Sequence, residues 1–522
     1  MAEKNRYGQY FTIKPIADFM VTLISHSKES KVLEPSCGRG VFLQSLAEQG
    51  FGNLSAYEID ASLGTPFSCV KFGSFLSVPT SEKYGVVIGN PPYIRWKNIE
   101  PELKQELEHS ELWNRYFNSL CDYLFVFILK SIEHLEEGGE LIFICTDYWL
   151  NTTHSASLRR YMCENGSFSE IYHFKEAPLF EKVTASFIIF RYVKGGQRRS
   201  SISLYQYNKE RGLPTLQELA DRSCFRLVEI PQFSPRGRWV LASEEQQERL
   251  AGFEAACTKA GGSLFPSDEA VLPELYRIGQ FCDIGNGMVS GLDAAFQMKD
   301  TSGLNAHERQ ALITVMKAKD LCPYRNKSTT PYIFLQEEID EAAFEKKYPR
   351  FARHFRPHLE KLARRYSYSR HIPYWEFVFP RNQKLFERKE ARIFVPCKER
   401  ISNKDYFRFC YAPEGCYPTQ DVTAIFRKPK TRESLEYILA YLNDPRVFEW
   451  LGLNGIVKGA IVEFSEAPIA SIPFRRIDWQ EEEEVRLHDR ITAEVRAYLD
   501  TSAPVHITNI HQCFDLLFHV PN

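Results

Sequence analysis

A short apolar run that ends in two prolines constrains this chain more than any other feature. Residues 84–89 read as a buried strand, and Asn90-Pro91-Pro92-Tyr93 follows it directly. Because the two prolines prevent the strand from continuing into a helix, we expect Asn90 at the carboxyl end of the strand. Open α/β sheets place their ligand-binding crevices at that edge. The tetrapeptide is therefore either a simple tight turn or a site that holds a planar, amine-bearing ring.

A glycine-containing segment upstream of this run predicts a ligand-binding turn. Residues 31–37 read as a strand, Gly38 and Gly40 as a turn, and residues 41–47 as a helix. Glycine lets a ligand approach the backbone, and a helix start offers free N–H groups. The next strand carries Glu58, about twenty positions further on, where a carboxylate can hold both hydroxyls of a ribose. Position 43 is Leu, not the third glycine of a dinucleotide fingerprint, so adenosine without a pyrophosphate fits better.

The alternation of strands and helices over the first part of the chain predicts a seven-stranded, doubly wound α/β sheet of the Rossmann-like type. Thr12 precedes the first predicted helix, and we expect it to cap that helix or to contact a ligand. Residues 201–207 read as a further edge strand. We expect a catalytic domain over residues 1–242 and a mixed α+β domain with a C-terminal helical segment over residues 243–522. The other predicted strands are residues 54–60, 69–72, 140–145, 169–174 and 184–192, and the main helices are residues 16–24 and 121–135.

Composition excludes several classes of protein. At 522 residues, with 44% apolar and 14% aromatic residues, the chain can form the cores of two or more domains. The thirteen cysteines are scattered without a metal-ligand spacing, which predicts reduced thiols and no metal site. No apolar run approaches the roughly 18 residues of a membrane span, and the N-terminus lacks the pattern of a signal peptide. We therefore expect a cytoplasmic protein with no membrane segment.

The formal net charge of -2 conceals a strongly basic segment. Residues 346–408 contain 18 Lys and Arg against 6 Asp and Glu, a formal charge of +12. Such a segment, with aromatic residues interleaved, is typical of a surface that binds a phosphate backbone, although a solvated helix face is the alternative. The candidates for phosphate contact are Arg364, Arg365, Arg370, Arg381 and Lys398.

In their order along the chain, these segments resemble the gamma-class, TaqI-like DNA adenine-N6 methyltransferases, which use S-adenosylmethionine. The resemblance covers residues 8–193. It implies that Thr12, Glu34 and Ser36 contact the methionine part of the cofactor, with Gly38 in the adjacent turn. It further implies that Glu58 binds the ribose and that Ile59 and Phe75 flank the adenine. The family usually has Asp where this chain has Ser74, so the contact to the adenine amine stays open at this position.

The resemblance also implies a chemistry for the tetrapeptide. The Asn90 side-chain oxygen and the Pro91 carbonyl would accept both hydrogens of the target amine, whose lone pair would then point at the methyl group. Tyr93 and Phe180 would stack on an adenine flipped out of the duplex, the Tyr93 ring being important and its hydroxyl not. The alternative for Phe180, and also for Phe75, is that the side chain simply packs in the core. None of the cysteines has an expected catalytic role.

We therefore expect a site-specific methyltransferase acting on double-stranded DNA, the modification partner of a restriction system. Because the chain starts close to the first cofactor segment, we expect a separate cognate endonuclease and not a fused one, and we expect a monomer. The same tetrapeptide could serve cytosine N4, an RNA base or a protein glutamine. A non-catalytic DNA-binding partner that retains the fold is a further alternative, against which intact Glu34, Glu58 and Asn90 argue.

Overall fold

The structure is a computed structural model that divides into two compact units, one of Met1–Gln247 with Lys458–Ala460 and one of Glu248–Val457 with Ile461–Asn522. Within the described residues, no helix combines the length and the apolarity that crossing a bilayer requires. The described residues are 7–175, 177–180, 185–196, 199–208, 212–235, 239–258, 274–366, 370–401, 404–455, 457–458 and 461–519.

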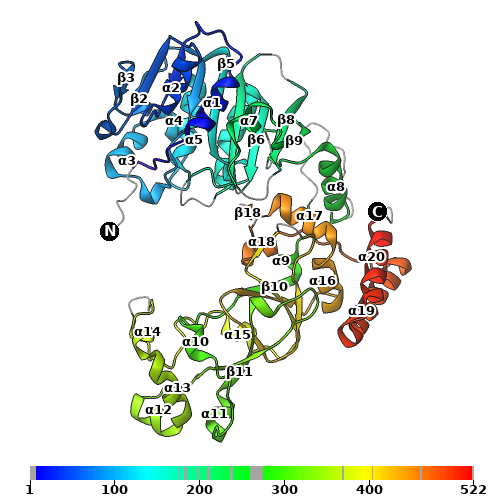
Figure 1. The fold of residues 1–522 in the computed structure, drawn as a ribbon. Coiled ribbons are helices and arrows are strands. Elements are labelled where there is room, and N and C mark those ends of the chain that lie inside the picture. The colour runs from blue at the N-terminus through cyan, green and yellow to red at the C-terminus, as the bar shows by residue number, and fades with distance from the viewer. Residues whose placement is uncertain are drawn as a thin grey trace. The chain divides into compact units, whose positions relative to one another are not determined.

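The first unit is built on a mostly parallel sheet (Figure 1). In the part of the chain that the structure describes, the sheet has nine strands in the order β3-β2-β1-β4-β5-β7-β6-β8-β9. Strand β7 runs antiparallel to both of its neighbours. The strands are β1 (Val32–Glu34), β2 (Leu54–Glu58), β3 (Val70–Phe72), β4 (Tyr84–Gly89), β5 (Leu135–Thr146), β6 (Gly166–Lys175), β7 (Phe187–Lys194), β8 (Ser201–Tyr207) and β9 (Phe225–Pro231).

The predicted α/β fold is confirmed, and so is the further strand predicted at residues 201–207, which is β8 and pairs parallel with β6. Strand β9, which pairs antiparallel with β8, was not predicted and extends the sheet by one more strand. Strand β5 also begins at Leu135, directly after the preceding helix, and not at Glu140. The register shifts between the pairs Tyr84–Leu135 and Val86–Glu140. This irregularity accommodates Gly138, whose φ of 80° is in the left-handed region.

The central strand β4 is apolar throughout because both of its faces are covered. Val86 and Ile88 join the core that contains residues of α1 and α2, whereas Val87 joins the core that contains α5. Successive side chains of a strand point to opposite faces, so each core takes alternate residues. The helices of this unit are α1 (Lys14–Thr22), α2 (Val41–Glu48), α3 (Pro101–Glu108), α4 (Glu111–Tyr116), α5 (Tyr123–His134), α6 (Ala156–Asn165) and α7 (Leu216–Ala220).

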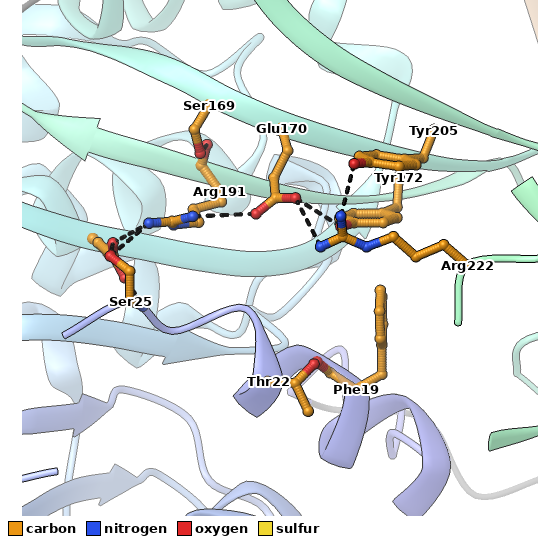
Figure 2. A network of polar contacts seen from close by, with 10 residues as sticks. Phe19, Thr22, Ser25, Ser169, Glu170, Tyr172, Arg191, Tyr205 and Arg222 are labelled. Carbon is orange, nitrogen blue, oxygen red and sulfur yellow. Dashed lines mark hydrogen bonds and ion pairs between the residues drawn. The ribbon is translucent and has the colours of Figure 1, made fainter. Parts of the chain in front are cut away.

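A chain of polar contacts links the antiparallel part of this sheet to the segment after α1 (Figure 2). Arg191 of β7 donates from Nη2 to Ser25 Oγ at 2.7 Å and from Nη1 to Glu170 Oε1 at 3.3 Å. Glu170 Oε2 accepts from the Tyr172 hydroxyl at 2.7 Å and lies 3.6 Å from Arg222 Nη2. Arg191 also pairs with the buried Glu140, so two arginines offset two buried carboxylates, and the network holds β6 and β7 in one arrangement.

The second unit contains mixed α and β structure. Its described residues form a four-stranded sheet in the order β10-β17-β13-β15, a three-stranded sheet in the order β12-β11-β16, and an antiparallel pairing of β14 with β19. The strands are β10 (Cys282–Asn286), β11 (Leu312–Met316), β12 (Thr330–Ile333), β13 (Arg392–Pro396), β14 (Lys398–Arg400), β15 (Cys410–Ala412), β16 (Cys416–Pro418), β17 (Val422–Arg427) and β19 (Ile461–Glu463), while β18 (Val457–Lys458) has one residue in each unit.

The C-terminal part of the second unit is helical. Leu487, Ile491 and Val495 recur every four residues on α19 and are buried, so this helix packs by one apolar stripe. It contacts both α16 and α20. The helices are α9 (Ile278–Phe281), α10 (Asp293–Phe296), α11 (Ala306–Gln310), α12 (Glu341–Lys347), α13 (Pro349–Phe355), α14 (Leu359–Ala363), α15 (Gln383–Phe386), α16 (Leu435–Leu442), α17 (Pro445–Asn454), α18 (Glu466–Ala470), α19 (Glu482–Thr501) and α20 (Pro504–His519), while α8 (Glu244–Ala255) spans the sequence boundary.

Candidate functional site

One cavity of the first unit brings together predicted site residues from five separate segments of the chain. Its volume is about 320 Å³, within the range of roughly 300–1,000 Å³ that is typical of small-molecule sites. One of these segments precedes α1, and the others lie at the carboxyl ends of strands. They meet because parallel strands place their carboxyl ends at the same edge of the sheet. The predicted site residues in its wall are Thr12, Glu34, Ser36, Gly38, Glu58, Ile59, Ser74, Phe75, Asn90, Pro91 and Pro92.

Glu58, at the end of β2, is held by two backbone amides. The Gly38 N–H donates to Glu58 Oε2 at 2.7 Å, and the Asp60 N–H donates to Oε1 at 2.8 Å. Gly38 has a φ of 54°, a left-handed conformation in which few other residues would be unstrained. Each carboxylate oxygen can accept two hydrogen bonds, so the buried Glu58 side chain keeps acceptor capacity for ligand hydroxyls.

Glu34, the last residue of β1, is a buried carboxylate that lacks a full set of partners. Its side chain is 1% exposed, and within the described structure its Oε2 atom has no hydrogen-bond partner. Burial, and then the negative charge of Glu58, raise the pKa of Glu34 well above its usual value. Leaving a buried acceptor unsatisfied is costly. The site is therefore suited to a ligand that brings a cationic or hydrogen-donating group to Glu34.

The Asn90 side chain is held by the segment before α1. Its Nδ2 atom donates to the Tyr10 carbonyl at 2.7 Å and to Thr12 Oγ1 at 3.1 Å. Thr12 therefore faces the cavity, and the expectation that it caps α1 was wrong: the cap residue is Ile13, which makes no side-chain capping bond. The Ser36 hydroxyl donates to the Asn90 carbonyl at 3.1 Å, which fixes the backbone of the same residue.

The Tyr93 hydroxyl lies within hydrogen-bond distance of two acceptors. Asn90 Oδ1 is 2.5 Å away and the Ile144 carbonyl is 2.9 Å away. A hydroxyl carries one hydrogen, so Tyr93 donates to one of them at a time. Burial raises the pKa of Tyr93 well above its usual value, which keeps the hydroxyl protonated. The sequence prediction gave the role to the ring and none to the hydroxyl, and it did not foresee the contact of the hydroxyl with Asn90.

The Tyr10 ring lies close to two other aromatic rings, one of them that of Tyr93, whose hydroxyl contacts Asn90. The Tyr10 ring centroid is 5.8 Å from that of Tyr93 and 6.4 Å from that of Phe180. Tyr10 is 38% exposed, whereas Phe180 is 6% exposed and packs 4.7 Å from the Phe187 ring. Sequence reasoning missed Tyr10, because an aromatic residue before a helix carries no periodicity. Residues 181–184, which complete the segment predicted to present Phe180, lie outside the described residues.

Ser74 and Phe75 lie where β3 leads into the 3-10 helix η2 (Phe75–Ser77). The Ser74 hydroxyl donates to Glu106 Oε1 at 2.6 Å, a contact with α3 that the sequence did not predict. Phe75 is buried, with its ring centroid 5.1 Å from that of Phe127, and it also lines the cavity beside the half-buried Ile59. The ring of Phe75 therefore belongs to the core and to the cavity wall at once.

Three of the five predicted phosphate-contacting residues donate to backbone carbonyls of the second unit. Arg365 donates to the carbonyls of Ser290, Pro373 and Glu376 at 3.1, 2.7 and 2.8 Å. Burial lowers the pKa of Arg365. Arg370 Nη2 donates to the Val378 carbonyl at 3.0 Å, and Arg381 Nε donates to the Gly287 carbonyl at 2.7 Å. Each of these guanidinium groups thus has a structural partner inside its own unit.

The other two predicted residues are directed toward solvent. Arg364 has a side chain that is 78% exposed and pairs with the equally exposed Glu360 at 2.5 Å. Lys398 is exposed on β14, whose neighbouring residue Glu399 is buried. A surface ion pair such as Arg364–Glu360 is worth little free energy and can be exchanged for another anionic partner. Among the described residues, no group of three or more His, Cys, Asp or Glu side chains is arranged to hold a metal ion.

Comparison with known proteins finds relatives over nearly the whole chain. The model of the Eco57I restriction-modification methylase family matches residues 53–180. The type II methyltransferase M.HindII of Haemophilus influenzae (strain ATCC 51907 / DSM 11121 / KW20 / Rd) is 44% identical over 503 residues, which cover 95% of each chain. The type II methyltransferase M.HincII of Haemophilus influenzae is 41% identical over the same share of each chain.

A solved structure shares the fold at much lower sequence similarity. The type IIL restriction-modification enzyme MmeI in complex with DNA matches with a TM-score of 0.60 at 11% identity. The match covers 98% of this chain and 73% of that one. Both units of the chain therefore have counterparts of similar fold.

Proposed function

The chain belongs to the type II DNA methyltransferases of restriction-modification systems, and from this membership we propose that it methylates the exocyclic N6 amine of adenine in double-stranded DNA. The methyl donor is S-adenosylmethionine. The observation that carries the proposal is the Asn90 carboxamide, held by the chain itself in the wall of the cavity that also contains Glu34 and Glu58. A separate cognate endonuclease and a monomeric state remain part of the proposal.

The residues of the cavity fit S-adenosylmethionine. Glu34, with its unsatisfied Oε2 atom, suits the methionine ammonium group, and Thr12 and Ser36 offer hydroxyls nearby. Glu58 would accept from the ribose hydroxyls while its backbone donors hold it in place. Ile59 and Phe75 are the apolar residues suited to the faces of the adenine ring. When bound, the cofactor supplies an electrophilic methyl group on a positively charged sulfur.

The orientation of the Asn90 side chain determines which atom it offers to the target base. Both Nδ2 hydrogens are engaged, by the Tyr10 carbonyl and by Thr12 Oγ1, so turning the amide over would lose two hydrogen bonds. Oδ1 is therefore the atom that can face a base. It has two lone pairs, and one can accept from an adenine amine while the other accepts from Tyr93.

These acceptors overcome the weak nucleophilicity of the adenine amine, whose lone pair is delocalised into the ring. When Asn90 Oδ1 and the Pro91 carbonyl accept the two amine hydrogens, the nitrogen becomes more tetrahedral and its lone pair is freed. Transfer is a direct displacement in which the N6–methyl bond forms as the methyl–sulfur bond breaks, and N6 then loses one proton. Positioning and oriented dipoles provide the rate enhancement, and no cysteine takes part.

A base inside a duplex cannot reach such a cavity, so the adenine is flipped out at a cost of a few kcal/mol. Stacking against aromatic rings contributes about 1–3 kcal/mol per base and can offset that cost. Tyr93 is the first candidate for this role, and the exposed Tyr10 ring, 5.8 Å from it, is the second. Phe180 would complete the aromatic wall next to Tyr10.

The proposed reaction is tested by identifying the methylated nucleoside. The purified protein is incubated with duplex DNA of varied sequence and S-adenosylmethionine carrying an isotopically labelled methyl group, and the DNA is digested to nucleosides for mass spectrometry. The proposal predicts labelled N6-methyldeoxyadenosine. Label in N4-methyldeoxycytidine alone would contradict the assigned base. Absence of label from every duplex, by protein that binds the cofactor, would contradict the reaction itself.

A further inference from the structure

A polar cluster borders the cavity at Ser74. The Ser74 and Ser77 hydroxyls both donate to Oε1 of Glu106 at 2.6 Å. Tyr123, a buried cavity residue, lies beside them. Burial, and then the Glu106 charge, raise the pKa of Tyr123, which keeps its hydroxyl protonated beside Ser74. Four polar groups from η2, α3 and α5 thus meet at one place in the wall.

Glu106 is placed at this cluster by the packing of α3. Leu103 and Leu107 of the same helix are buried in the core, and Leu103 also lines the cavity. Glu106, three residues after Leu103, borders this buried face of the helix and is half-buried. Its carboxylate therefore stands behind Ser74, 32 positions earlier in the chain, and does not itself form the cavity wall.

The Glu106 contact fixes the direction of the Ser74 hydroxyl. A serine hydroxyl has one hydrogen and two lone pairs. Because the hydrogen points to the carboxylate, the oxygen faces the rest of its surroundings as an acceptor. With the Tyr123 hydroxyl beside it, one lone pair remains for a ligand. Ser74 is half-buried and lines the cavity, so the wall at this point accepts a hydrogen bond and does not donate one.

We propose that Ser74 and Glu106 act together to select a 6-amino purine, with the Ser74 oxygen as the direct acceptor and Glu106 as its positioning residue. This inference rests on the proposed use of S-adenosylmethionine, whose adenine would lie against Phe75 next to Ser74. An exocyclic amine donates to the fixed oxygen. A 6-oxo purine would instead place its own oxygen against it. The carboxylate that strengthens the contact thus comes from α3 and acts through a serine.

The inference is tested by the ratio of two affinities, measured by titration calorimetry on the full chain. The ligands are S-adenosyl-L-homocysteine and its 6-oxo counterpart, S-inosyl-L-homocysteine. The contact joins a neutral amine and a neutral hydroxyl oxygen, and such a hydrogen bond is worth about 0.5–1.5 kcal/mol, so the wild type should prefer the 6-amino ligand by roughly 2- to 13-fold. Equal affinities would overturn the selection by Ser74. Failure to bind either ligand would instead overturn the proposed cofactor.

Glu106→Gln supplies a readout that a merely structural defect would not give. The glutamine amide can donate to the Ser74 oxygen, which frees the hydroxyl hydrogen to turn to a 6-oxo group. The variant should bind S-adenosyl-L-homocysteine more weakly and S-inosyl-L-homocysteine more tightly than the wild type. Glu108→Gln, at an exposed position of the same helix, should leave both affinities unchanged. An equal loss of both affinities in Glu106→Gln would overturn the inference.

A second variant tests whether the two residues act as a unit. Ser74→Asp in the wild-type background places two carboxylates at hydrogen-bond distance, and like charges this close cannot both ionise. It should weaken S-adenosyl-L-homocysteine binding by at least tenfold. In the Glu106→Gln background, the same replacement provides a single acceptor and should restore most of the affinity. An identical effect of Ser74→Asp in both backgrounds would show that the residues are independent and would contradict the proposal.

Discussion

The two units of the chain differ in how their sequences encode a site. In the first unit, Glu34 and Glu58 end parallel strands and Asn90 directly follows one, and all three line one cavity. In the second unit, the candidates were chosen from a segment with a formal charge of +12, and Arg365, Arg370 and Arg381 donate to backbone carbonyls. A motif at a strand end encodes a position in space, whereas a count of charges encodes only composition.

Several other cations of the basic segment also have internal partners. Arg392 is fully buried and donates to the carbonyls of Phe386 and Cys416, among others. Lys404 and Arg408 both pair with the buried Glu399. Paired and buried cations contribute little to the field outside the protein, so the surface is less basic than the count suggests. Salt-dependent binding would therefore depend on the exposed members of the segment.

The largest effect is expected at Asn90. Asn90→Ala removes the proposed acceptor for the target amine, and the loss of one positioned oxyanion-hole-type group typically lowers kcat by about 10²–10³-fold. Cofactor affinity should change by less than about threefold, because the Glu34 and Glu58 contacts remain. Labelled methyl transfer and calorimetry measure the two quantities. Asn98→Ala, at an exposed position nearby, is the matched control. If Asn90→Ala lost methyl transfer and cofactor binding to the same extent, the assignment of Asn90 to the target amine would be wrong.

A pH-dependent effect is expected at Glu34. Its pKa is raised in the free protein, so the carboxyl becomes neutral as pH falls through that raised value. A ligand with an ammonium group favours the charged form of the carboxyl. Cofactor affinity should therefore begin to fall, as the pH decreases, at pH values still well above the usual glutamate pKa of about 4.3. Glu34→Gln should bind about tenfold or more weakly and lose this dependence. Calorimetry across pH checks both; an unchanged pH profile in the variant would exclude Glu34 as its source.

The contrast between neighbouring arginines sharpens the comparison of the units. Arg365→Ala removes three hydrogen bonds to backbone carbonyls, at about 1 kcal/mol each, and should lower the free energy of unfolding by about 2–3 kcal/mol in denaturant titration. Arg364→Ala should leave stability within about 0.5 kcal/mol because its ion pair is exposed. If Arg364 meets a phosphate, its loss should reduce the salt slope of DNA binding by about one. The reverse assignment of the two effects would contradict the orientations described.

A smaller effect is expected from the Tyr93 hydroxyl. Tyr93→Phe keeps the ring and removes one hydrogen bond to Asn90 Oδ1, worth about 1 kcal/mol, which corresponds to roughly a fivefold lower kcat. Cofactor affinity should be unchanged. Steady-state kinetics with a single-site duplex separates kcat from KM. Tyr93→Ala should be much worse because stacking is also lost, and equal activities of the two variants would leave the ring without a role.

The sequence predicted those parts of the fold and site that depend on local pattern. Glycine turns, strand ends and the Pro-Pro pair located Gly38, Glu58 and Asn90 because each pattern restricts the backbone on its own. Tyr10 and Glu106 were missed because their contacts exist only after the segment before α1 and helix α3 have packed. Strand β9 was missed for a related reason, since an edge strand with one covered face carries a weaker apolar signal.

The assignment of adenine methylation to Asn90 is tested most directly by mapping methylated bases in DNA from cells that express the protein. Cells with the wild-type chain should carry N6-methyladenine at every copy of one short sequence, and cells with Asn90→Ala at the same protein level should carry it at far fewer copies. Methylated cytosine in place of adenine, or N6-methyladenine at the wild-type level with Asn90→Ala, would contradict the assignment.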